Sequence, residues 1–297
     1  MPVETNDNPD TKNHLQLGEF CCALNFKDVG PEFQASVKNY FENFMTSREP
    51  DIRIDIEIIL DRDKVSPPQS LCTSKTVTEN RFDYHSGLIQ GCLDLERKAC
   101  FLQVKNVFFG NSSVRVFEQF FHQLYFSLLE NKYGAGRYEK ILVHSCGVLK
   151  NGCGYIFTGP SGSGKSTVAQ LSKNHAVLND EMCFVNNSGS RYRVQSTPFN
   201  GYFCNKINSS GPLTAIFLLK QDTRNFIKTI KFSDAVVAVA REIVPMIGVL
   251  DNVNKKCSVT AMIDTAAKVL SAVPFYELHF IPDKSLWDCI DAWEQKN

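Results

Sequence analysis

Residues 154–181 read GYIFTGPSGSGKSTVAQLSKNHAVLNDE, and the interpretation of the chain starts from this stretch. An apolar run at 155–157 leads into a turn with three glycines, and a helix is expected at about 164–173. A second apolar run, 176–178, ends at two adjacent carboxylates, Asp180 and Glu181. The stretch therefore predicts a strand, a Gly-rich turn, a helix and another strand in close succession.

The turn fits the pattern G-x-x-x-x-G-K-[ST], which cradles nucleotide phosphates when it lies between a strand and a helix. Its glycines let several backbone N–H groups point inward, and the helix N-terminus behind them adds positive potential. The lysine neutralises the β- and γ-phosphates, and the next hydroxyl can bind Mg²⁺. A chance Gly/Ser-rich turn is the alternative, but the lysine, the hydroxyl and both flanking elements argue against it. The predicted nucleotide-binding residues are Gly159, Pro160, Ser161, Gly162, Ser163, Gly164, Lys165, Ser166 and Thr167.

The acidic pair comes unusually soon after the loop, because Asp180 follows Lys165 by only 15 residues. The strand that ends there would return beside the loop and place both carboxylates near a bound metal. One of Asp180 and Glu181 would take a proton from the acceptor and the other would hold the metal or its water; the two roles remain open. Ser166 and Asp180 are the predicted metal ligands. The alternative is a solvated turn after a strand.

His144 lies on the strand before this unit, 15 residues ahead of Gly159. It is either an ordinary core or edge histidine or a polar group near the transferred phosphoryl. With it, the predicted catalytic residues are Asp180, Glu181, Lys165 and His144. Arg224 and Arg241 could reach a phosphate, but their polar turn and helix surface favour solvated or ion-paired side chains.

The rest of the chain falls into two regions. Residues 51–60 alternate as a strand, and residues 88–95 and 99–105 predict a hairpin. From residue 140, short strands alternate with helices. The predicted organisation is a flexible tail at 1–15, a β-rich domain at 16–137 and a nucleotide-binding domain at 138–297. The helices are expected at 113–131, 164–173, 233–246, 259–272 and 285–295.

Composition excludes some classes of function. The 297 residues include 32 basic and 32 acidic side chains, so no net charge draws the chain to nucleic acid or anionic lipid. No apolar run reaches the roughly 18 residues of a membrane span, and the polar start has no secretory signal. The 11 cysteines include no Cys-x-x-Cys pair and predict reduced thiols. We therefore expect a cytoplasmic protein that binds neither nucleic acid nor membrane.

Several segments together resemble the HPr kinase/phosphorylase-related family, whose catalytic core is similar to that of phosphoenolpyruvate carboxykinase. The resemblance covers about residues 140–290. It is carried by His144, the phosphate loop 159–167, Leu178-Asn179-Asp180-Glu181, Thr197-Pro198-Phe199-Asn200-Gly201, the strand 213–220 and Tyr276-Glu277-Leu278-His279-Phe280-Ile281-Pro282-Asp283. It implies an α/β fold, a carboxykinase/HPr kinase-like phosphate-loop domain with a mixed sheet, after a β-rich α+β N-terminal domain. It also implies a substrate loop with Thr197, Phe199 and Asn200, where a plain turn is the alternative.

These observations predict a phosphotransferase that uses ATP and Mg²⁺. The acceptor would be a hydroxyl of a protein, a peptide or a small molecule, and a homo-oligomer is left open. The alternative from another functional class is a non-catalytic ATP-binding module that acts through a partner. The carboxylate pair favours the enzyme, because a pure sensor needs the loop more than two acids beside it.

Overall fold

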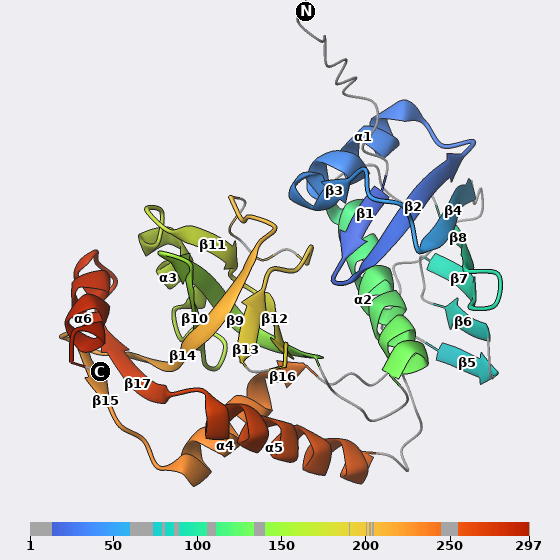
Figure 1. The fold of residues 1–297 in the computed structure, drawn as a ribbon. Coiled ribbons are helices and arrows are strands. Elements are labelled where there is room, and N and C mark those ends of the chain that lie inside the picture. The colour runs from blue at the N-terminus through green and yellow to red at the C-terminus, as the bar shows by residue number, and fades with distance from the viewer. Residues whose placement is uncertain are drawn as a thin grey trace, which may run out of the picture. The chain divides into compact units, whose positions relative to one another are not determined.

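The structure is a computed structural model, and two compact units make up the chain, Met1–Leu128 and Leu129–Asn297 (Figure 1). Residues 1–13 of the predicted tail lie outside the described part of the chain. The structure describes residues 14–59, 74–78, 81–85, 89–105, 111–133, 140–189, 191–199, 201, 203, 205–244 and 255–296.

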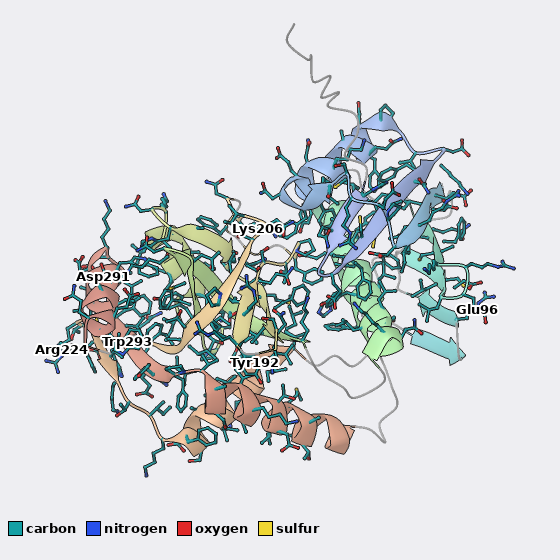
Figure 2. The ribbon with its side chains drawn as sticks, viewed as in Figure 1. Glu96, Tyr192, Lys206, Arg224, Asp291 and Trp293 are labelled. Atoms are coloured by element: carbon teal, nitrogen blue, oxygen red, sulfur yellow. The ribbon has the colours of Figure 1, made fainter. Side chains whose placement is uncertain are left out.

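The first unit is built on one mixed sheet. Its strands lie in the order β3-β1-β2-β4-β8-β7-β6-β5, and the pairs β2–β4 and β4–β8 are parallel. Ile52, Ile54 and Ile56 are buried on one face of β4, as the period of two predicts. The predicted hairpin is confirmed as β7–β8, with Glu96 in its turn (Figure 2). The strands are β1 (His14–Leu17), β2 (Phe20–Lys27), β3 (Met45–Thr46), β4 (Ile52–Ile59), β5 (Ser74–Thr78), β6 (Arg81–His85), β7 (Ile89–Asp94) and β8 (Ala99–Lys105).

Two helices, α1 (Pro31–Tyr40) and α2 (Asn111–Tyr133), supply aromatic side chains to the core of this unit. The rings of Phe33 and Phe117 lie 5.6 Å apart, and Tyr125 of α2 meets Phe20 of β2 at 6.0 Å. The period of apolar residues in α2 therefore predicts both the helix and its buried face correctly. A 3₁₀ turn, Glu42–Phe44, follows α1.

The second unit is also rich in strands. Its hydrogen-bonded path runs β10-β9-β12-β13-β14-β17-β15, and β11 and β16 add to β9. The strands are β9 (Lys140–Lys150), β10 (Cys153–Thr158), β11 (Ala176–Asn179), β12 (Met182–Asn187), β13 (Tyr192–Gln195), β14 (Ser210–Gln221), β15 (Phe226–Lys228), β16 (Ile243–Val244) and β17 (Phe275–Phe280). The helices are α3 (Lys165–Leu171), α4 (Phe232–Glu242), α5 (Lys255–Ala272) and α6 (Ser285–Glu294).

Five of these strands close into a barrel, because β10 pairs with β14 as well as with β9. The two long strands make the closure possible. In β9, residues 140–144 pair with β12 and residues 145–150 with β10. In β14, residues 210–212 pair with β13 and residues 213–218 with β10. Each long strand thus passes from one neighbour to the next along its length.

The predicted fold class, an α/β phosphate-loop kinase domain of the carboxykinase/HPr kinase type, is therefore wrong. The structure is mostly β, with a closed five-strand barrel and few helices. Alternating strands and helices indicate an α/β sheet only when helical crossovers join parallel strands. Here the turns after β9 and β12 join antiparallel neighbours, and β13 also pairs antiparallel with β14. The periodicity of side chains within a segment carries no information about which strands pair with each other.

Strand β14 lies between two hydrophobic clusters. Ile216 and Leu218 face a cluster that includes α4 and α5, while Phe217 and Leu219 face one that includes α3 and α6. Alternate side chains of a strand point to opposite faces, so a strand covered on both sides is apolar throughout. This packing holds the carboxyl end of β14 beside both the phosphate loop and α4.

Candidate functional site

The loop 159–164 connects β10 to α3 and depends on glycine at three positions. Gly159, Gly162 and Gly164 have φ values of 147°, 79° and 107°, a region that side chains disfavour. Gly164 also packs closely, because a Cβ there would lie 2.5 Å from Cζ of Phe280. Within the turn, the Ser163 N–H donates to the Pro160 carbonyl at 3.0 Å. The local conformation thus follows from the residues that define the motif.

Lys165, the first residue of α3, folds its side chain back over this loop. Its Nζ donates to the carbonyl oxygens of Gly159 at 2.6 Å and Pro160 at 3.2 Å. Burial lowers the pKa of Lys165, whereas the nearby carboxylates of Glu242 and Glu181 oppose this shift. A buried ammonium whose contacts are loop carbonyls is placed to meet an anion at the loop.

Ser163 supplies a further sign of an anion site. Its residue is 9% exposed, and its hydroxyl oxygen is buried without a hydrogen-bond partner in the described structure. Buried hydroxyls are normally paired, so a ligand oxygen at the loop would satisfy it. Ser166 and Thr167 are half-buried in the first turn of α3, next to Lys165.

Asn179 organises the turn that carries the acidic pair. Its side-chain amide donates to Thr197 O, Thr197 Oγ1 and Phe199 O at 2.6–3.1 Å, and its Oδ1 accepts the N–H groups of Glu181 and Met182. Sequence reasoning did not assign this role to Asn179. Its signal was only its place at the end of an apolar strand.

The two acidic residues have different surroundings. Asp180 is 1% exposed, and its Oδ1 accepts the N–H of Phe203 at 3.2 Å. The side chain of Glu181 is 37% exposed and lies 3.7 Å from Nε2 of His144. The structure therefore brings Glu181, rather than Asp180, to the surface beside the histidine.

The predicted substrate loop lies mostly inside the protein. Thr197 and Phe199 are 0% and 1% exposed. The Thr197 hydroxyl donates to Met182 O at 2.7 Å, and the Phe199 carbonyl also accepts from the buried Lys206 at 2.8 Å. These contacts support the Asn179 turn. Asn200 lies outside the described residues.

His144 is held by a carboxylate that the sequence did not reveal. Its Nδ1 lies 2.9 Å from Oε2 of Glu242, the last residue of α4. The helix was predicted to reach residue 246, but it ends at 242 because Ile243 and Val244 pair with Val143 and Leu142 of β9. Continuing that antiparallel register places Glu242 opposite His144. No sequence pattern near these residues indicates that the two segments pair.

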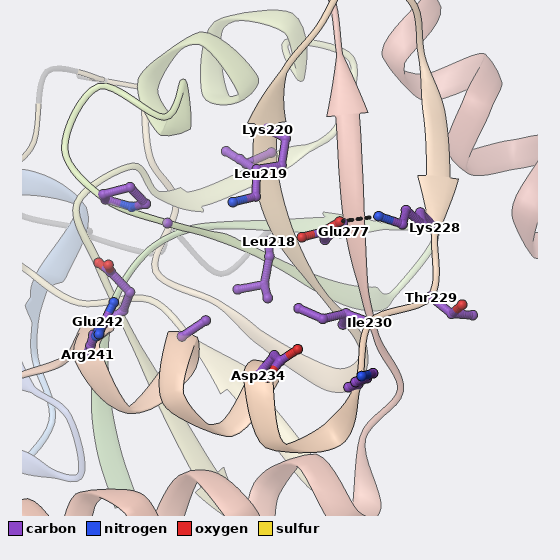
Figure 3. A pocket seen from close by; sticks show the side chains of 14 residues that line it. Leu218, Leu219, Lys220, Lys228, Thr229, Ile230, Asp234, Arg241, Glu242 and Glu277 are labelled. Carbon is purple, nitrogen blue, oxygen red and sulfur yellow. Dashed lines mark ion pairs between the residues drawn. The ribbon is translucent and has the colours of Figure 1, made fainter.

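Two pockets share lining residues at the end of α4. The larger, about 630 Å³, is bordered by Gly159 and Pro160 and by residues of β14, the β15–α4 loop and α4 (Figure 3). The smaller, about 270 Å³, is bordered by His144, Glu181 and Met182. Arg241 and Glu242 line both pockets. The other arginine considered above, Arg224, lies over the ring of Phe226 at 5.2 Å.

The described residues offer few side-chain ligands for a metal ion. Within the described ranges, no group of three His, Cys, Asp or Glu side chains is arranged to hold an ion. A phosphate-loop Mg²⁺ needs fewer protein ligands, because the phosphates and water supply the others. The Ser166 hydroxyl and the Asp180 carboxylate are oxygen donors of the kind that Mg²⁺ prefers. The orphaned Ser163 hydroxyl and the glycine-lined cradle fit a phosphate group.

The comparison with protein families identifies the chain. A family model described as SynChlorMet cassette protein ScmC matches residues 122–293, which is more than half of the chain. The chain belongs to this ScmC family. The resemblance to HPr kinase/phosphorylase-related proteins is thereby corrected, because the matching model is ScmC and no other family supports that assignment. The short motifs behind the resemblance are compatible with more than one family.

The ScmC match covers the loop 159–164, His144, the acidic pair and both pockets. No curated protein matches the chain. None of the helices that the structure describes has the length and apolar character needed to cross a membrane.

Proposed function

We propose that this protein binds a nucleoside triphosphate, ATP, at residues 159–167 and transfers its terminal phosphoryl group to a hydroxyl. The observation that carries the proposal is that two neighbouring pockets share the lining residues Arg241 and Glu242. One pocket borders the phosphate loop and the other borders His144 and Glu181. A phosphoryl donor and an acid–base pair would thus lie next to the same two residues.

The nucleotide half of the proposal rests on the loop. Backbone N–H groups freed by three left-handed glycines would bind phosphate oxygens, and the Ser163 hydroxyl would gain the partner that it lacks. Lys165 would exchange its contacts with two carbonyls for contacts with the β- and γ-phosphates. Mg²⁺ held by Ser166 and Asp180 would neutralise phosphate charge during transfer.

The acceptor half rests on Glu181 and His144. Glu181 is the more exposed carboxylate of the pair, so it is placed to take the proton of the acceptor hydroxyl. Glu242 fixes the imidazole of His144 through Nδ1 and leaves Nε2 directed toward Glu181. The acceptor oxygen forms a bond to the γ-phosphorus, the bond from that phosphorus to the bridging oxygen breaks, and ADP leaves with the electron pair.

Paired measurements of turnover and binding test the proposal. ATP conversion to ADP and equilibrium nucleotide binding would be followed in wild type, Glu181→Gln and Asp180→Asn. A general base contributes about 10²- to 10⁴-fold, so Glu181→Gln should lose turnover while retaining binding. Equal turnover in all three proteins would remove both carboxylates from the mechanism and favour the ATP-binding module. No nucleotide binding by wild type would refute both readings.

A further inference from the structure

The 630 Å³ pocket would adjoin the phosphate end of a nucleotide bound at the loop. Lys165 contacts Gly159 and Pro160, and these are the two phosphate-loop residues in the pocket lining. In phosphate loops of this pattern, the lysine reaches the β- and γ-phosphates, whereas the nucleoside lies beyond the α-phosphate. The pocket therefore faces the transferred phosphoryl group and not the nucleoside.

Some of the charged side chains in this pocket have a partner of opposite charge, and others do not. Lys228 forms an ion pair with Glu277 at 3.5 Å (Figure 3), and Glu242 contacts His144. The remaining cations of the lining are Lys220, Lys231 and Arg241. Among the described residues, none of these three has an ion-pair partner within 4 Å, although Asp234 lies in the same lining. The lining thus carries four cations and three carboxylates, an excess of one positive charge, next to the expected γ-phosphoryl position.

The shape of the site favours a compact ligand. A volume of about 630 Å³ falls within the 300–1,000 Å³ typical of small-molecule sites. Buried Leu218 and Leu219 contribute apolar surface, while the free cations stand at exposed positions. In Figure 3, Asp234 lies near one end of α4, and Arg241 and Glu242 lie at its other end.

We infer that the acceptor is a small anionic alcohol, whose carboxylate or phosphate binds in this pocket at Arg241, the cation that lines both pockets. This inference rests on the proposed function and selects one of its acceptor classes. The anion binds to Arg241 in the larger pocket, and the hydroxyl extends toward Glu181 in the lining of the smaller pocket. Glu181 takes the hydroxyl proton, the hydroxyl oxygen bonds to the γ-phosphorus, and ADP departs.

Matched acceptors test the requirement for a negative charge. The full chain with Mg-ATP would be given N-acetylserine or its neutral amide, N-acetylserinamide, and separately glycerol 3-phosphate or glycerol. Mass spectrometry detects each phosphorylated product. Since a hydrogen bond to a charged group contributes about 1.5–3 kcal/mol, the anionic member of at least one pair should be favoured roughly 10- to 100-fold in kcat/KM. The pair that responds distinguishes a carboxylate from a phosphate.

Variants locate that preference. Arg241→Gln should reduce the preference for the anionic acceptor about tenfold, whereas Lys231→Gln, at the opposite end of α4, and Lys173→Gln, an exposed lysine outside the pocket lining, should not. Equal use of charged and neutral acceptors, absence of transfer to either pair, or an unchanged preference in Arg241→Gln would overturn the inference. Stabilisation of wild type by Mg-ATP in a thermal shift separates such a failure from failure of the nucleotide site.

Discussion

Gly164→Ala offers a sharp test of how the phosphate loop is built. The left-handed φ of 107° should cost about 1–2 kcal/mol for a residue with a side chain. The new methyl would also meet the Phe280 ring at 2.5 Å, and that ring is 2% exposed and cannot move into solvent. Overpacking of this kind costs about 1–3 kcal/mol. We expect a total loss of about 2–5 kcal/mol in the free energy of unfolding.

Gly162→Ala is the matched control. Gly162 has a φ of 79°, but a Cβ there would meet nothing within 4 Å. It should therefore show only the backbone term, about 1–2 kcal/mol. The difference between the two variants isolates the contact with Phe280.

Tryptophan fluorescence provides the assay. The chain has two tryptophans, Trp287 and Trp293, and both lie in α6, so urea unfolding followed by their emission reports on the second unit. Phe280→Leu should relieve part of the Gly164→Ala loss, which gives a coupling of about 1 kcal/mol or more in a double-mutant cycle. Equal losses for both glycine variants together with an additive cycle would refute the packing argument.

Three further outcomes are expected. Lys165→Met should abolish stabilisation by Mg-ATP, yet it should raise the free energy of unfolding at pH 7. Because the pKa of Lys165 is lowered in the folded state, this gain in stability should shrink as the pH rises toward 10.5. A gain that stays constant with pH would contradict the argument. Asn179→Ala should cost about 2–4 kcal/mol in urea unfolding, since it leaves several buried groups unpaired, whereas the exposed Asn187→Ala should change stability by less than about 0.5 kcal/mol. Glu242→Gln should slow phosphoryl transfer about tenfold or more with little change in nucleotide binding, and Glu242→Asp should restore part of the rate; a loss of binding instead would assign Glu242 a structural role.

Part of this structure could be predicted from the sequence, because it depends only on residues that are close together in the chain. The glycines, lysine and hydroxyl of 159–167 specify a turn whose conformation depends on neighbours in the chain, so the loop was predicted residue by residue. Periods of two and of 3.6 likewise located β4, α2 and the β7–β8 hairpin, because side-chain direction within an element follows from its own geometry. Whether the loop binds ATP stays a prediction.

Pairing between distant strands was decided only by the tertiary structure. The barrel closes through β10 and β14, which are separated by more than 50 residues, and periodicity carries no information about that partner. For the same reason, the contact between Glu242 and His144 could not be predicted. It forms because β16 pairs with β9 and thereby ends α4 at residue 242. Thr197 and Phe199 were expected in a substrate loop but are buried around Asn179. Each element's identity comes from short-range periodicity, whereas the meeting of side chains about 100 residues apart depends on which strands exchange backbone hydrogen bonds.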